Sequence, residues 1–121
     1  MSLEPTIRTH IKTAVGSTPV FMNIAPAGTT GSYIVQRLIG KQDAELGTSF
    51  ARIQWDIYGT TYAAVKDIAV LVEGAIRTFD GGDTFAIYRG NEIETYEQET
   101  NQHRVIFDAV LRFDERPNFD S

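Results

Sequence analysis

The chain has 121 residues, 42% of them hydrophobic and 22% charged, so the sequence predicts one soluble globular domain, 1–121, with a modest core and a loose tail from about residue 115. It contains no cysteine, which excludes disulfides and thiolate chemistry. No apolar run reaches the length of a membrane span, and the N-terminus lacks the apolar region of a signal peptide. We therefore expect no membrane partner and no signal peptide.

Charge is distributed unevenly along the chain. Residues 1–79 carry a net charge of +1, whereas residues 80–121 hold 4 basic and 10 acidic side chains, a net of −6. An acidic C-terminal third argues against a broad phosphate-binding surface. Two interpretations stay open: a solvated face that aids solubility, or an acidic surface that meets a basic patch on a partner or a neighbouring copy.

The first third of the chain predicts a helix over 4–15, because Ile7, Ile11 and Val15 repeat at helical spacing. A short apolar run at 20–24 is compatible with an edge strand. Residues 25–31 contain one proline and two glycines, which is typical of an irregular loop.

Two strands and a hairpin loop are predicted next. Residues 33–38 read as a strand with two mixed faces, and Gly40 and Gly47 bracket a polar loop, Lys41–Leu46, that is longer than a turn requires. Long polar loops on rigid strands commonly contact partners. The strand at 51–58 shows clean period-two alternation, with one core face (Ala51, Ile53, Trp55, Ile57) and one polar face (Arg52, Gln54, Asp56, Tyr58).

A helix after Thr60 or Thr61 is predicted from a long apolar stripe, widened by Val70 and Leu71: Tyr62, Val65, Ile68, Ala69, Val72, Ile76, Phe79. Gly74 lies inside this helix, where either another backbone packs closely or the helix is weak.

The last third predicts a strand at 84–89, a break at Gly90-Asn91, a solvated acidic segment at 92–102 and a long final strand. One face of that last strand is apolar and predicted to join the core: Val105, Phe107, Ala109, Leu111, Phe113. Ile106 and Val110 are apolar on the opposite, charged face, which is compatible with partial cover by another copy.

Motifs for chemistry are weak throughout. His10 and His103 lack the convergent ligands that zinc needs and read as surface or structural residues. Arg52, Asp56 and Tyr58 share a strand face, but such a triplet is more often a charge network on a solvated face than a catalytic site. We predict no enzyme activity, no metal site and no cofactor.

Several short motifs occur in one order along residues 20–113: Gln36-Arg37, Gly40, Ala51-Arg52, Gln54, Asp56, Tyr58, Thr61-Tyr62-Ala63, Lys66, Tyr96-Glu97, Thr100, His103-Arg104 and Phe107. In this order they resemble the tail-completion proteins (tail terminators, or tail-to-head joining proteins) of long-tailed bacteriophages. The resemblance implies an α+β fold with two helices on a mainly antiparallel four-stranded sheet, in which a ββαββ core follows an N-terminal helix.

The resemblance also implies a function in virion assembly. Such proteins form a ring, generally a hexamer, at the head-proximal end of the tail, where it ends tube polymerisation and joins tail to head. The implied partners are other copies of the chain, the tail tube protein and the head connector protein, while DNA passes through the ring without specific binding. The expected location is the virion tail, after synthesis in the bacterial host cytoplasm.

Ring closure needs two different patches on each copy. The candidate interface residues lie on the polar sheet face, in the hairpin loop and in the acidic segment: Arg37, Lys41, Asp43, Glu45, Arg52, Gln54, Asp56, Glu94, Glu97 and Glu99. The alternatives are another head–tail connector of the head-closure type, and a small ferredoxin-like ligand-binding domain or enzyme. A pocket with convergent polar groups would favour the last of these.

Overall fold

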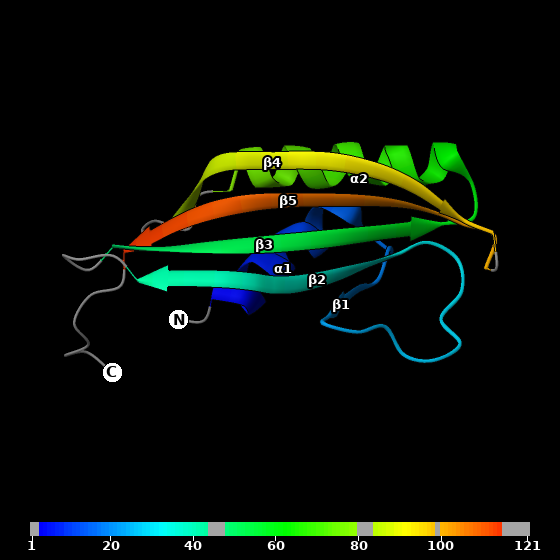
Figure 1. Cartoon of the computed structure of the whole chain (residues 1–121), viewed down its shortest axis with the longest axis horizontal. Coiled ribbons are helices and arrows are strands. Elements are labelled where there is room, and N and C mark those ends of the chain that lie inside the picture. Colours follow the sequence, from blue (N-terminus) through cyan, green and yellow to red (C-terminus); the bar gives the residue numbers. More distant parts are fainter. Residues whose placement is uncertain (1–2, 44–47, 80–83, 99, 115–121) are drawn as a thin grey trace.

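The computed structural model describes residues 3–43, 48–79, 84–98 and 100–114. Two helices and five strands follow one another along the chain: α1 (Leu3–Val15), β1 (Val20–Met22), β2 (Tyr33–Asp43), β3 (Thr48–Gly59), α2 (Tyr62–Arg77), β4 (Thr84–Glu97) and β5 (Gln102–Asp114). The strands form one sheet in the order β1-β2-β3-β5-β4. Both helices lie behind that sheet in Figure 1, so the molecule has a helix layer and a sheet layer.

The predicted α+β class with two helices is confirmed, and so is the ββαββ core, which β2, β3, α2, β4 and β5 form. The sheet is mainly antiparallel, as expected, but it has five strands and not four. The edge strand expected at 20–24 is present as β1 and pairs in parallel with Ile34–Gln36 of β2. The connection between β1 and β2 reverses the chain twice, with positive φ angles at Asn23, Gly28 and Gly31. The chain therefore enters β2 in the same direction as β1. The short apolar run of β1 does not indicate in the sequence that the pairing is parallel.

The core lies between the helices and one face of the sheet. Ile7, Ile11 and Val15 of α1 are all buried, as the helical spacing predicts. The sheet contributes the alternating apolar residues that were predicted for β3 and β5: Ala51, Ile53, Trp55, Ile57, Val105, Phe107, Ala109 and Leu111. The side chain of Phe113 lies outside the described side chains.

One polar side chain belongs to this core. Gln36 is fully buried, and its Oε1 accepts a hydrogen bond of 2.9 Å from Nε1 of Trp55. A buried indole N–H requires an acceptor. Gln36 is thus a core residue, although the mixed strand faces had assigned it no such role.

Helix α2 begins after Thr61, whose side chain accepts a hydrogen bond from the backbone N–H of Ala64. Most of its predicted stripe is buried. The prediction is wrong for Tyr62, Val70 and Leu71, which are exposed. The helix packs on one side only, so an apolar stripe wider than that contact leaves Val70 and Leu71 in solvent.

Two predicted loops are partly strands. β2 continues to Asp43, so Lys41 and Asp43 pair with Ala51 and Ser49 instead of lying in a long loop. β4 runs through the predicted break at residues 90–91, where a shift of register between Arg89 and Glu92 accommodates one extra residue. Residues 92–97 of the acidic segment therefore form the second half of an edge strand.

Candidate assembly surface

The surface opposite the helices carries most of the residues predicted for an interface. We call it the open face; its described side chains from β2, β3 and β5 alternate with the core residues and include Tyr33, Arg37, Arg52, Gln54, Asp56, Tyr58, Arg104, Ile106, Asp108 and Val110. Since α1 and α2 both pack on the other face, these side chains face away from the core.

Asp56 lies at the centre of a charge network on the open face. Its side chain is fully buried, with Oδ2 located 2.6 Å from Nη2 of Arg104 and 3.6 Å from Nη2 of Arg37. Oδ1 accepts a hydrogen bond of 2.7 Å from Nε2 of Gln54. A carboxylate can be buried at low cost only when cations and donors surround it in this way. The prediction of a solvated face is therefore wrong for Asp56, because its neighbours cover it.

Two tyrosines extend the network towards β1. The rings of Tyr33 and Tyr58 stack with centroids 4.7 Å apart, and the guanidinium of Arg104 lies 5.4 Å from the centroid of Tyr58. Burial raises the pKa of Tyr58, with a further contribution from Asp56, against the opposing charge of Arg104. Burial lowers the pKa of Arg104, but the hydrogen bond and the negative charge of Asp56 raise it by more, so the net shift of the Arg104 pKa is upward. Both groups therefore keep their protons near neutral pH, which suits binding better than proton transfer.

The other end of the open face holds a second Arg–Asp pair and a pocket. Arg52 Nη1 lies 2.9 Å from Oδ2 of Asp108, and both side chains keep contact with solvent. Next to this pair is an open hollow of about 380 Å³. Its lining combines apolar and positively charged side chains and comes from β2, β3 and β5: Ile39, Gly40, Lys41, Phe50, Ala51, Arg52 and Val110. The charged groups of this lining are two cations, Lys41 and Arg52.

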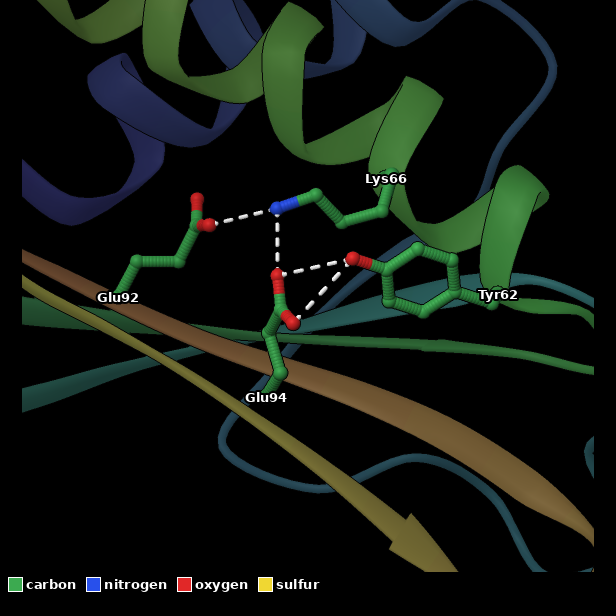
Figure 2. Close-up of polar contacts among 4 residues, drawn as sticks. All are labelled: Tyr62, Lys66, Glu92 and Glu94. Atoms are coloured by element: carbon green, nitrogen blue, oxygen red, sulfur yellow. Dashed lines mark hydrogen bonds and ion pairs between the residues drawn. The ribbon is translucent and has the colours of Figure 1, made fainter.

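A separate cluster joins β4 to α2, which we call the Lys66 clasp (Figure 2). Nζ of Lys66 lies 2.8 Å from Oε2 of Glu92 and 2.6 Å from Oε2 of Glu94, and the hydroxyl of Tyr62 donates to Glu94 at 3.3 Å. The hydrogen bonds to Glu92 and Glu94 raise the pKa of Lys66, and the Lys66 hydrogen bond lowers the pKa of Glu94. Glu92 and Glu94 are exposed to solvent, as predicted, and they also connect the edge strand to the helix through Lys66.

The acidic segment is divided between the two faces of the sheet. Glu94 is opposite Val105 and faces the helix layer, whereas Glu97 reaches the open face and lies 3.8 Å from Nη1 of Arg104. This division follows from strand geometry, because residues separated by an odd number point to opposite faces. The acidic segment is therefore not one patch.

The fold of this chain, but not its sequence, matches a known protein. No protein-family model matches it, and no curated protein matches its sequence. Its fold, however, is found in a virion. A chain of a structure described as "Virion of native gene transfer agent (GTA) particle" superposes with a TM-score of 0.66 at 13% sequence identity, over 93% of this chain and 95% of that chain. At this identity the likeness establishes a shared fold.

The structure brings five of the ten predicted interface residues onto the open face: Arg37, Arg52, Gln54, Asp56 and Glu97. Lys41 lines the hollow and Glu94 belongs to the Lys66 clasp. The side chain of Asp43, and all of Glu45 and Glu99, lie outside the described residues.

Arg104 was missed among the predicted interface residues, although it contacts Asp56, Tyr58 and Glu97. The alternation of β5 places it on the polar side of that strand, but only the β3–β5 register brings it to Asp56.

The two histidines and the acidic residues that the structure describes do not form a metal site. No group of three or more potential metal ligands occurs among those residues. Nε2 of His10 lies 2.8 Å from the carbonyl oxygen of Ala75, and His103 contacts the rings of Tyr62 and Tyr96. Neither described helix has the length and apolar character needed to cross a membrane.

Proposed function

We propose that this chain is a structural virion protein of a tailed phage or phage-like particle, and specifically the tail terminator. In this role it forms a ring, a hexamer when assembled, at the head-proximal end of the tail, ends polymerisation of the tube and joins tail to head. The observation that most strongly supports a virion protein is the fold likeness to a chain of a gene transfer agent virion, which extends over nearly the whole of both chains. The narrower role of tail terminator rests on the resemblance of the sequence to tail-completion proteins.

The open face adds independent support. Residues that resemble the tail-completion family in sequence, among them Arg37, Gln54, Asp56 and Arg104, meet there in one network of ion pairs and hydrogen bonds. This network is ordered within a single copy, so little side-chain entropy would be lost when a partner docks. Residues with no part in covering the core thus form an ordered surface suited to contact with the tube, the connector or another copy.

A structural role also fits the chemistry of the open face. Its Tyr58 and Arg104 hold their protons more tightly than usual, and its carboxylate Asp56 is covered by cations. Such a site binds and positions better than it transfers protons. We infer that the chain acts in assembly without catalysis and without a cofactor.

Electron microscopy of particles made without this chain tests the proposal. Tails that are overlong, or that end in no head, are expected if the chain terminates the tube. Tails of normal length attached to heads would overturn the proposal. Tails of normal length lying free beside filled heads would instead indicate a head-closure connector. Restoration of normal particles by a plasmid copy of the chain is the control.

A further inference from the structure

The hollow on the open face has a composition that fits an apolar knob with a neighbouring acid. Ile39, Phe50 and Val110 supply apolar walls, and Lys41 and Arg52 supply cations. Arg52 keeps 46% of its side-chain surface exposed while it pairs with Asp108. The hollow of about 380 Å³ is equivalent to on the order of ten waters at liquid volume. Displacement of poorly held water from apolar walls would favour binding.

The outer side of α2 carries a knob of matching chemistry. Val70 and Leu71 are 65% and 46% exposed, although every other large aliphatic residue of that helix is buried. Asp67, one turn earlier on the same side, is also exposed. A Cβ built on Gly74, one turn later, meets nothing within 4 Å, so packing within the chain gives no reason for a glycine there.

The hollow and the knob lie on opposite sides of one copy, because α2 covers the face of the sheet that is turned away from the open face. We propose that α2 of one copy docks in the hollow of the next, with Val70 and Leu71 against its apolar walls and Asp67 next to Arg52. This inference rests on the proposed ring and assigns the surfaces that build it. A contact between two different patches is heterologous, so its repetition gives either a closed ring or a filament.

Charge and geometry favour a second copy as the occupant. The knob and the hollow are complementary in both polarity and charge, and both belong to the same chain. A knob on one surface with a complementary pocket elsewhere on the same molecule is the arrangement that drives head-to-tail association.

Disulfide trapping tests this contact directly, because the chain has no cysteine of its own. Leu71→Cys protein is mixed with Ile39→Cys protein under mild oxidation. We expect the mixed dimer to form at least about tenfold faster than in a mixture of Thr9→Cys and Ile39→Cys proteins, because docking raises the local thiol concentration to the order of millimolar. Thr9 is exposed on α1, away from the knob. Equal rates in the two mixtures would overturn the inference.

A second variant tests whether the hollow itself is the docking site. Gly40 lines the hollow, and a Cβ built on it meets nothing within 4 Å, so Gly40→Leu fills the hollow without a clash at the Cβ. This substitution in the Ile39→Cys chain should reduce the trapping rate to that of the Thr9→Cys mixture. An unchanged rate would contradict docking in the hollow.

Trapping in assembled particles separates this inference from the proposed function. A chain with both Ile39→Cys and Leu71→Cys should give covalent multimers in purified tails. If the chain is present in tails but only monomers are recovered, the assigned surfaces are wrong while the terminator role stands. If the chain is absent from the tails, the proposed function itself fails.

Discussion

The two Arg–Asp pairs of the open face should differ in strength, and a double-mutant cycle on each measures that difference. Both pairs join β3 to β5: Asp56 with Arg104 at 2.6 Å, and Arg52 with Asp108 at 2.9 Å. They differ in burial, since Asp56 is fully buried under a 23% exposed Arg104, whereas Arg52 and Asp108 both contact solvent.

The magnitude follows from that difference. A hydrogen bond to a charged partner contributes about 1.5–3 kcal/mol when water is excluded, and an exposed ion pair about 0.2–1 kcal/mol. Arg104 retains some solvent, so we expect a coupling free energy of about 2 kcal/mol for Asp56 and Arg104. For Arg52 and Asp108 we expect about 0.5 kcal/mol or less, and a larger fractional loss in high salt.

Urea unfolding provides the assay, with Asp56→Asn and Arg104→Gln in one cycle and Arg52→Gln and Asp108→Asn in the other. Trp55 is the single tryptophan and is fully buried, so its fluorescence follows unfolding in every variant. Size-exclusion chromatography of each variant at the concentration used checks that the measurement is made on the monomer. Equal coupling energies in the two cycles, or a stronger pair at Arg52, would refute the reasoning that burial strengthens the Asp56 network.

Three further predictions concern single contacts. Gln36→Leu should lower the free energy of unfolding by about 1–3 kcal/mol, because the buried Trp55 N–H loses its acceptor. In the control, Gln36→Leu in a Trp55→Phe background should lower the free energy of unfolding by less. An equal decrease in both backgrounds would contradict the hydrogen bond between Gln36 and Trp55. Gly59→Ala should lower the free energy of unfolding by about 1–3 kcal/mol, because the added Cβ would lie 2.6 Å from Cγ2 of buried Val65. Gly74→Ala, whose Cβ meets nothing within 4 Å, should raise it by about 0.5–1 kcal/mol in urea unfolding. A Gly59→Ala variant more stable than Gly74→Ala would contradict the close packing at Gly59. The pKa of Glu94 is lowered in the folded state, so the Lys66 clasp stabilises the fold fully above the unfolded-state pKa of about 4.3, and this stability is lost as the pH falls through the lower pKa of the folded state. In the Lys66→Met variant, a carbon NMR titration should show the pKa of Glu94 back in its ordinary range. An unchanged titration midpoint would exclude Lys66 as the cause.

The sequence predicted the parts of the fold that depend on local patterns, such as alternation along a strand or spacing along a helix. Alternation in β3 and β5 assigned the core face correctly, and helical spacing assigned Ile7, Ile11 and Val15. The resemblance to tail-completion proteins selected Arg37, Gln54 and Asp56, which the structure brings together.

What the sequence missed depends on pairing between distant segments. The role of Gln36 requires the β2–β3 register that places it opposite Trp55, and the cover of Asp56 requires Arg104 from β5. The parallel pairing of β1 and the clasp between Lys66 and Glu94 likewise join segments whose contact no local pattern encodes. Glycine and asparagine at 90–91 predicted a break, yet the pairing with β5 continues beyond them.

Localisation of the chain in intact particles tests the central claim most directly. Immunogold electron microscopy with antibodies against the purified chain should label a single site where the tail meets the head. Label along the tube, at the distal end of the tail or on the head shell, or no label on particles that carry complete tails, would contradict a terminator at the head-proximal end.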